Sequence, residues 1–402
     1  MENTPLYDAI VVGGGPAGAT AAHDLARYGR RVLLLDRRGR TKPCGGAVPP
    51  RLLEEFAIPE NVLATRVRGA RIVAPSAREV PMPIAGGGFV GMVDRDVFDE
   101  WLRRRAAAMG AERRDGTFVE LVRESRGYLV RYRDAGARSD GPTREARART
   151  VIGADGATSQ VAAQAMPGVP RPQFVYAYHE IVRAPVGEAC YEPARCDVVY
   201  DSRYSPDFYG WVFPHGDVAS VGVGTAERGV SLRGAVARMR QRLGLDSAET
   251  MRREGAPIPM SARARWDDGQ GVVLVGDAAG VVAPASGEGI YYAMCTGRLA
   301  ASAINDFCAD GDRQRLRQVR RRFMALHGRV FFILGVMQRY WYSSDARRER
   351  FVALCGDTDI QDLTWEAYMK KELVRARPLV HARIFIKNIA HLTGCLPAWA
   401  DA

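Results

Sequence analysis

The chain has 402 residues, 47% of them hydrophobic, which is long enough for one large core and a second domain. Its 57 Lys and Arg against 46 Asp and Glu give a net charge of +11, but the cations are mostly interleaved with acids, which argues against a nucleic-acid-binding stripe. The seven cysteines form no CxxC pair and the six histidines no HExxH motif, so we expect no metal site.

The chain opens with a pattern that predicts a βαβ unit. Residues 8–12 and 31–36 are apolar runs typical of buried parallel strands, and residues 17–28 have the spacing of a helix. A second helix is expected over about 94–109, with Phe98 on its apolar face. The first part of the chain therefore indicates an α/β domain.

A glycine-rich turn joins the first predicted strand to the first predicted helix, and Asp36 ends the second strand. Gly13 permits a tight turn, Gly15 lets the backbone approach a pyrophosphate, and Gly18 allows close packing of helix on strand. The phosphates would lie at the positive end of the helix, and Asp36 would accept hydrogen bonds from ribose hydroxyls. This pattern alone leaves NAD and FAD open. The expected dinucleotide contacts here are Gly13, Gly15, Pro16, Ala17, Gly18, Asp36 and Arg37.

The middle of the chain changes character. Short strands rich in Tyr, Val and Phe over about 173–225 predict an antiparallel sheet, our candidate substrate domain. An apolar strand returns at 272–275, and a glycine-rich loop leads into a helix over about 289–306. We predict a discontinuous FAD-binding domain of residues 1–75, 94–165 and 265–306, a substrate domain of residues 76–93 and 166–264, and a helical C-terminal region of residues 307–402.

Two further motifs favour FAD. One runs from Val151 to Ser159, and the other begins at Gly276-Asp277 and ends at Gly287-Glu-Gly289. With the first motif they resemble the flavoprotein superfamily built like para-hydroxybenzoate hydroxylase. The resemblance implies a Rossmann-like FAD domain, Asp277 on the ribityl chain, and a helix N-terminus at the flavin pyrimidine edge. The FAD contacts that it implies are Arg95, Val119 through its backbone at adenine, Asp155, Gly156, Gly276, Asp277, Pro284, Gly287, Gly289 and Ile290.

Several of these residues also have a purely structural interpretation. Arg95 could be an ordinary first-turn cation paired with Asp99. Aromatic residues that alternate along a strand, such as Trp211 and Phe213, more often pack in a core than contact a ligand. Cys44 could be a small buried hydrophobe, the common fate of a free cysteine.

A narrower resemblance rests on Lys42-Pro-Cys44-Gly45-Gly46-Ala47 and on Tyr209-Gly-Trp211-Val-Phe213-Pro214. Both stretches are similar to the geranylgeranyl reductase family, in particular its chlorophyll and bacteriochlorophyll branch. The resemblance implies that Cys44, Gly45, Gly46 and Ala47 lie by the flavin, with Cys44 as candidate catalytic residue. It also implies a substrate cavity lined by Tyr209, Trp211 and Phe213. His215 departs from the pattern, since relatives often place a Lys there.

The resemblance implies an FAD-dependent oxidoreductase acting on CH–CH bonds, with NADPH as electron donor. Its substrate would be the geranylgeranyl chain of a (bacterio)chlorophyll or of geranylgeranyl diphosphate, reduced to phytyl in (bacterio)chlorophyll biosynthesis. No second glycine-rich fingerprint places the nicotinamide site. The alternatives are an archaeal-type isoprenoid-lipid reductase, an aromatic or polyketide FAD monooxygenase, and a flavin-bound pigment carrier without turnover.

We expect a cytoplasmic chain, because no signal peptide precedes the first strand and no apolar run reaches the about 18 residues that span a bilayer. Contact with a membrane or with a (bacterio)chlorophyll synthase would then be peripheral. The arginine runs 320–322 and 347–350 are either solvated helix faces or contacts to anionic lipid. The aromatic segments 331–334 and 340–342 either dock on lipid or belong to the core.

Overall fold

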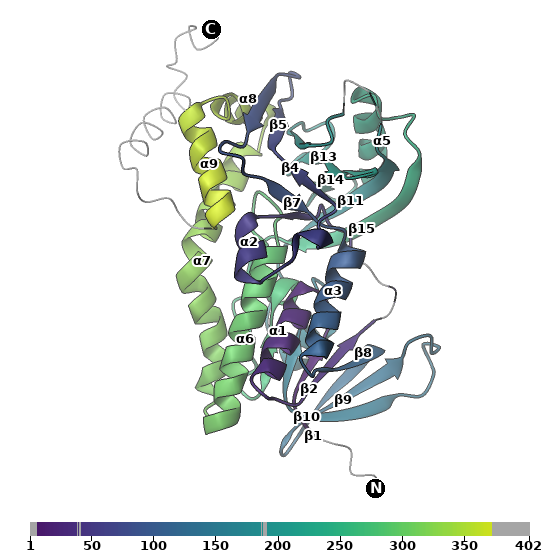
Figure 1. Cartoon of the computed structure of the whole chain (residues 1–402), viewed down its shortest axis with the longest axis vertical. Helices are drawn as coiled ribbons and strands as arrows, with labels where there is room; N and C mark the ends of the chain where they lie inside the picture. Colours follow the sequence, from purple (N-terminus) through teal and green to yellow (C-terminus); the bar gives the residue numbers. More distant parts are fainter. Residues whose placement is uncertain (1–5, 38, 40–41, 186, 188–190, 372–402) are drawn as a thin grey trace. The chain divides into compact units, whose positions relative to one another are not determined.

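The computed structural model of the chain describes residues 6–37, 39, 42–185, 187 and 191–371 (Figure 1). They form two compact units. The first comprises Met1–Cys44, Asp94–Tyr176 and Ala256–Gly335, and the second comprises Gly45–Val93, Ala177–Gly255 and Val336–Ala402.

A six-stranded sheet forms the centre of the first unit. Its strands are β1 (Leu6–Val12), β2 (Val32–Asp36), β8 (Glu112–Glu124), β9 (Gly127–Asp134), β10 (Arg144–Gly153) and β16 (Val272–Leu274). β1 lies between β2 and β10, and β8, β2, β1, β10 and β16 pair in parallel, whereas β9 is antiparallel to both β8 and β10. The predicted βαβ unit and the late return of a buried strand are confirmed. These strands read as apolar runs because both sheet faces are buried, as Ile10, Val11 and Leu33 are.

Helices cover this sheet, and α1 (Pro16–Arg27) contacts both α3 (Arg95–Ala108) and α6 (Ile290–Asp310) (Figure 1). A Cβ at Gly297 of α6 would lie 2.2 Å from the Ala17 carbonyl oxygen, so a glycine lets α6 approach α1. The short helix α4 (Gln160–Ala165) and the 3₁₀ turn η2 (Gly276–Ala279) belong to the same unit, and α7 (Gln314–Trp341) begins in it.

The second unit contains two sheets. The larger has the order β15-β11-β14-β13-β12-β5-β6 and the smaller the order β3-β7-β4. Their strands are β3 (Ala47–Val48), β4 (Thr65–Val67), β5 (Gly69–Val73), β6 (Glu79–Pro83), β7 (Val90–Met92), β11 (Phe174–Arg183), β12 (Arg195–Val199), β13 (Gly210–His215), β14 (Val218–Thr225) and β15 (Thr250–Pro259). The helices are α2 (Pro50–Glu55), η1 (Glu60–Val62), α5 (Leu232–Arg242), α8 (Asp345–Leu354) and α9 (Thr358–Lys370).

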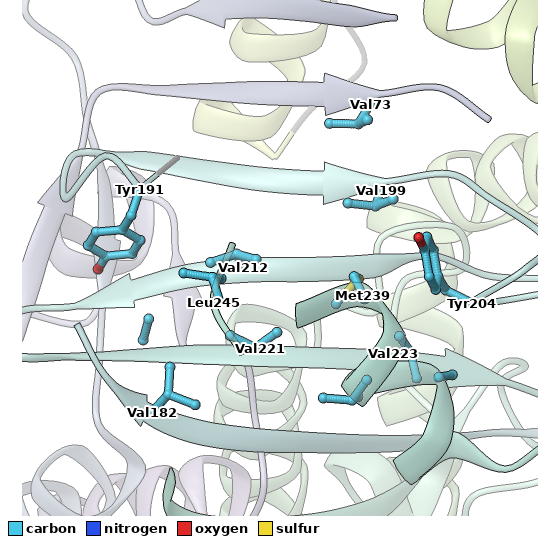
Figure 2. Close-up of a cluster of buried hydrophobic side chains, with 13 residues drawn as sticks. Val73, Val182, Tyr191, Val199, Tyr204, Val212, Val221, Val223, Met239 and Leu245 are labelled. Carbon is cyan, nitrogen blue, oxygen red and sulfur yellow. The ribbon is translucent and has the colours of Figure 1, made fainter. Parts of the chain in front are cut away.

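The larger sheet packs on α5 through a buried hydrophobic cluster that consists mostly of valines. Figure 2 shows this cluster, in which Val212 and Val221 come from neighbouring strands and Met239 comes from α5. A Cβ at Gly210 would lie 2.5 Å from the Met239 sulfur, so the helix lies directly on β13. This packing holds β13, which carries the aromatic motif, in place.

The sheet differs from the antiparallel one expected. β12 pairs with β5 in parallel, with Arg195 opposite Gly69, because the two strands come from distant segments and no hairpin joins them. The strand pattern spans residues 173–225, and the predicted substrate domain of residues 76–93 and 166–264 also contains β6 and β15, whereas β5 lies in a segment that we assigned to the FAD-binding domain.

The division of the chain also differs from the predicted one. Gly45–Val93 belongs to the second unit, since β3 and β4 pair with β7 and β5 joins the larger sheet. The boundary between the two units falls between residues 335 and 336, within α7, so the predicted C-terminal region is shared between both units. The predicted helical region also contains an apolar stretch at residues 379–389, which lies outside the described residues. Over the described part, no helix is both long and apolar enough to cross a membrane.

Candidate functional site

Two glycines in the turn between β1 and α1 are required because a Cβ there would clash with the backbone of the protein itself. Gly13 has φ of 106°, and a Cβ there would lie 2.3 Å from the Ala154 carbonyl oxygen. A Cβ at Gly18 would lie 1.9 Å from the Gly13 carbonyl oxygen. Pro16 stands in the first turn of α1, where its missing N–H costs no hydrogen bond, and Ala17 follows it. Gly13 and Gly18 are therefore required by the fold itself.

Gly15 is different, because nothing in the protein requires a glycine there. Its φ of −72° and ψ of −175° suit any residue. The nearest heavy atom to a Cβ at Gly15 would be Arg95 Nη2, at an ordinary contact distance of 3.8 Å. The space lies at the N-terminus of α1, which has no side-chain cap. Open space, a helix N-terminus and a guanidinium together fit a pyrophosphate.

Arg95, at the start of α3, is buried and held in a two-pronged ion pair. Its Nε and Nη2 donate to the two carboxylate oxygens of Asp99 at 2.8 and 2.7 Å. Burial disfavours the charged guanidinium and by itself would lower its pKa. The interactions with Asp99 and with the Cys44 side chain outweigh this effect, so the pKa of Arg95 lies above its usual value. The ion pair that we considered as an alternative is therefore present, and the same cation also lies beside Gly15.

Asp36, at the end of β2, lies over the glycine-rich turn. A Cβ at Gly14 would lie 2.8 Å from its carboxylate. Burial raises the pKa of Asp36, although the Gly14 N–H and the nearby Arg103 guanidinium oppose this shift. Arg103 Nη1 donates to Asp36 Oδ2 at 3.1 Å. The sequence motif did not indicate Arg103, which lies two turns after Arg95 on α3, whereas Arg37 is exposed.

A second cluster surrounds Asp277, which is nearly buried in η2. Its carboxylate accepts a hydrogen bond from Lys42, a partner that the motif did not reveal. A Cβ at Gly289 would lie 3.7 Å from Asp277 Oδ1, so the carboxylate lies near the N-terminus of α6, where Ile290 begins the helix. The structure thus brings together Asp277 and the helix end that the sequence predicts for the flavin.

Positive φ angles bend the backbone around this cluster. Gly276 and Gly287 have φ of 58° and 67°. Ala285, which follows Pro284, has φ of 64°, a conformation that costs a residue with a Cβ about 1 kcal/mol or more. The loop is closed by a hydrogen bond of 2.8 Å from the Ala283 N–H to the Glu288 carbonyl. The backbone that leads to α6 is therefore tightly specified.

The other three predicted contacts, Val119, Asp155 and Gly156, lie on or beside other elements of the first unit. Asp155 accepts hydrogen bonds from Ser159 Oγ at 2.5 Å and from the Gln160 N–H at 2.7 Å, so its carboxylate caps α4. Gly156 beside it has φ of 88°. The β8–β9 ladder skips Val119, whose carbonyl accepts a hydrogen bond from Gln164 instead. A backbone contact to adenine requires such a residue outside the ladder.

The predicted aromatic stripe is present in the second unit. Tyr209 and Trp211 have ring centroids 6.1 Å apart, and Trp211 and Phe213 have centroids 6.2 Å apart. Tyr209 and Trp211 are buried, whereas Phe213 is partly exposed. Trp211 lies across β14 over Gly222, where a Cβ would come 2.3 Å from the indole.

A buried polar chain fixes the indole of Trp211. Its Nε1–H donates to Ser220 Oγ at 3.0 Å, and Ser220 lies 2.8 Å from His179 Nδ1. His179 Nε2 lies 3.1 Å from Glu254 Oε2. Because Trp211 can only donate, every group is satisfied when Ser220 donates to His179 and His179 donates to Glu254. Sequence reasoning did not find this chain.

The Cys-Gly-Gly loop packs against the end of β13. A Cβ at Gly45 would lie 2.9 Å from the Phe213 ring, and one at Gly46 would lie 2.5 Å from His215 Cε1. His215 Nε2 lies 3.1 Å from the Gly45 carbonyl oxygen, so it donates to the loop. Ala47 then starts β3. His215, which departs from the Lys that the family resemblance predicts, is thus a hydrogen-bond donor to this loop.

Comparison with known proteins identifies relatives of the whole chain. The model of the FAD binding domain family matches residues 6–322. A geranylgeranyl diphosphate reductase of Rhodobacter capsulatus is 54% identical over 97% of this chain and 98% of its own. A chloroplastic geranylgeranyl diphosphate reductase of rice is 36% identical over 95% of this chain and 85% of its own.

The fold has solved counterparts. A geranylgeranyl bacteriochlorophyll reductase-like protein from Thermoplasma acidophilum superposes with a TM-score of 0.78, over 93% of this chain and 99% of its own, at 24% identity. The flavin-dependent brominase Bmp2 superposes with a TM-score of 0.73 at 17% identity, over 96% of this chain and 99% of its own. At these identities the superpositions show the shared fold alone.

Proposed function

The chain belongs to the geranylgeranyl reductase family of FAD-binding oxidoreductases, and from this premise we propose that it reduces the geranylgeranyl chain of a bacteriochlorophyll or of geranylgeranyl diphosphate in pigment biosynthesis. The observation that carries the proposal is the 54% identity to the Rhodobacter reductase, which extends over nearly the full length of both chains. We further propose that NADPH is the electron donor.

The first unit offers a separate group of residues for each part of FAD. The α1 N-terminus and Arg95 would bind the pyrophosphate, and Asp36 the adenosine ribose. Asp277 would take the ribityl hydroxyls. The backbone N–H groups of Gly289 and Ile290 would face the flavin pyrimidine edge, where the positive end of α6 favours negative charge. When bound, FAD supplies the hydride chemistry that the side chains lack.

The charge of Asp36 also bears on which nucleotide binds in this place. A carboxylate at the end of β2 repels the 2′-phosphate of NADPH. The first site therefore suits FAD, and the proposed donor would bind elsewhere and transiently.

We assign the second unit to the polyprenyl chain. An isolated alkene has no carbonyl to take up developing charge, so the rate depends on alignment, a positioned acid and exclusion of water. Tyr209, Trp211 and Phe213 would supply an apolar wall. Cys44, half-buried beside Arg95, would be the acid that protonates the alkene carbon.

A single substitution tests the role of Cys44. Cys44→Ala should retain FAD and lose alkene reduction by about 100-fold or more, the usual contribution of a positioned acid. Cys308→Ala is the matched control, because Cys308 is a half-buried thiol at the far end of α6. Unchanged turnover in Cys44→Ala would remove the thiol from the reaction.

The reaction itself is tested by anaerobic incubation with NADPH and either geranylgeranylated bacteriochlorophyll or geranylgeranyl diphosphate, with products followed by mass. Stepwise gains of two hydrogens are expected, and the preferred substrate separates the pigment-bound from the free chain. An added oxygen atom seen only in air would instead identify a monooxygenase. Retained FAD with no product from either substrate would identify a carrier.

A further inference from the structure

Helix α7 has an unusual balance of charge. Its 28 residues include seven arginines and no aspartate or glutamate, although the chain has 46 acidic residues. Arg315 pairs with Asp310 at 2.8 Å and Arg317 lies 3.9 Å from Asp267, so both of these arginines, near the start of the helix, face acids that lie outside it. The positive charge of α7 therefore has no compensation on its own helix.

One face of α7 belongs to the core of the first unit. Phe323, His327 and Phe331 are buried and lie against Tyr292 of α6, with centroid distances of 6.1, 5.2 and 4.9 Å. Trp266 adds a further ring contact to Phe323 at 5.3 Å. The apolar contacts that fold this helix onto its unit are thus already made on this face.

A second apolar face of the helix is left in solvent. Leu326, Phe332, Ile333 and Val336 are 68, 73, 42 and 50% exposed. At about 100° per residue these four positions fall within about a third of the helix circumference. Two exposed arginines lie on the same face, Arg322 and Arg329, and Arg321 and Arg339 border it. We call these four apolar and four basic residues the outer face of α7.

Of the residues that we considered as lipid contacts, some are buried in the structure and others are exposed. Phe331, Trp341 and Tyr342 are buried, and Tyr342 lies 3.1 Å from the Tyr200 hydroxyl, so these rings belong to the core. Within the second arginine run, Arg348 is buried and donates to Asp345 at 2.6 Å. Only Phe332 and Ile333 of the first aromatic segment remain strongly exposed.

We propose that the outer face of α7 docks this protein on an anionic lipid bilayer. Apolar side chains interleaved with arginines suit the boundary between acyl chains and phosphates, where the arginines meet lipid phosphates and Phe332 enters the acyl region. The inference goes beyond the reductase function and does not rest on it.

Charge argues against the two other occupants of this face. A second copy docked on the same face would place the four arginines of one outer face against the four of the other. The segment 372–402 of the chain carries four Lys and Arg against two acidic residues, so it too is basic. An anionic membrane surface is the partner that complements the helix.

Vesicle flotation of the full-length protein, without substrate or NADPH, tests the proposal. Binding should be strong to vesicles of phosphatidylcholine with phosphatidylglycerol, weak to phosphatidylcholine alone, and reduced by salt. The double variant Phe332→Ser/Ile333→Ser should bind at least about tenfold more weakly, from the loss of buried apolar area. The double variant Arg321→Glu/Arg322→Glu should bind anionic vesicles more weakly, by more than about fivefold for each residue changed.

Matched controls separate docking from loss of the fold. Val97→Ser removes an apolar residue of similar exposure on α3, and Arg138→Glu reverses an exposed charge in the loop between β9 and β10. Neither should change vesicle binding. Equal binding by wild type and both double variants would overturn the proposal.

A photo-crosslinker in place of Phe332 identifies what covers it. A lipid adduct after illumination with anionic vesicles supports docking. A crosslink to a second copy or to residues 372–402, unchanged by vesicles, overturns it. Reduction of substrate in detergent is measured separately, so a protein that reduces but does not float loses the docking proposal alone, and one that floats but does not reduce loses the function alone.

Discussion

The contrast between Gly15 and Gly18 allows FAD binding to be separated from folding. In Gly15→Ala, the added methyl group meets no protein atom closer than 3.8 Å, and the backbone conformation is allowed. The loss of unfolded-state entropy favours alanine by about 0.4–1 kcal/mol, and its weakness as an N-cap costs a similar amount. We therefore expect the free energy of unfolding of the FAD-free protein to change by less than about 0.5 kcal/mol.

FAD binding should respond very differently to the same methyl group. It occupies the space where the pyrophosphate would meet the N-terminus of α1, and the loss of one charge-assisted hydrogen bond there costs about 1.5–3 kcal/mol. The Kd for FAD should therefore rise by roughly 10- to 150-fold. In Gly18→Ala, the Cβ would lie 1.9 Å from the Gly13 carbonyl oxygen, so the fold itself should be lost or strongly destabilised.

Two measurements are needed for each variant. Quenching of flavin fluorescence gives the Kd for FAD, and urea unfolding of the FAD-free protein gives the free energy of unfolding. Gly168→Ala is the control, because a Cβ there has no neighbour within 4 Å. If Gly15→Ala bound FAD as the wild type does, the pyrophosphate could not lie against this residue and our placement of FAD would be wrong.

Three further predictions concern single groups of the site. Burial raises the pKa of Asp36, and ribose hydroxyls select its ionised form, so FAD affinity should weaken as pH falls through that pKa. In the FAD-free protein, the same raised pKa makes the free energy of unfolding increase as the pH falls. Asp36→Asn has no carboxyl group to titrate, so it should flatten the pH dependence of FAD affinity in calorimetric titrations. Ser220→Ala should lower the free energy of unfolding by about 1–3 kcal/mol and shift tryptophan emission, because the indole of Trp211 loses its acceptor, whereas the exposed Ser139→Ala, in the loop between β9 and β10, should do neither. Iodoacetamide should label Cys44, with protection by FAD, but not Cys355, since burial raises the pKa of that thiol to about 12; labelling of Cys44 unaffected by FAD would contradict its place in the site.

Features that depend on neighbouring residues could be predicted from the sequence. Part of the turn is specified locally, because Gly13 has a positive φ and a Cβ at Gly18 would meet the Gly13 carbonyl oxygen, and the strands around it are specified by their own apolar runs. The same holds for the helix that begins at Ile290, because the glycines before it supply the required bends. Local geometry is therefore sufficient to predict the frame of the site.

Features that depend on pairing across the chain could not be predicted in this way. Asp36 meets Arg103, and Asp277 meets Lys42, but a sequence with 57 Lys and Arg does not reveal which cation reaches which carboxylate. The chain from Trp211 through Ser220 and His179 to Glu254 joins four strands, β13, β14, β11 and β15. Such contacts depend on the strand order of the larger sheet, and the parallel pairing of β5 with β12 shows that this order does not follow the sequence.

The net charge illustrates how composition can hide a local feature. We took the cations as mostly interleaved with acids apart from two short runs, and this interpretation holds where arginines lie opposite carboxylates, as Arg95 lies opposite Asp99. Yet α7 alone supplies seven of the eleven net positive charges in 28 residues, which leaves four for the remainder of the chain. Because the same helix exposes Phe332 and Leu326, positive charge and apolar surface are concentrated together on one element. A reductase whose substrate carries a long polyprenyl chain would need to work close to lipid, and α7 is the described helix best suited to bring it there.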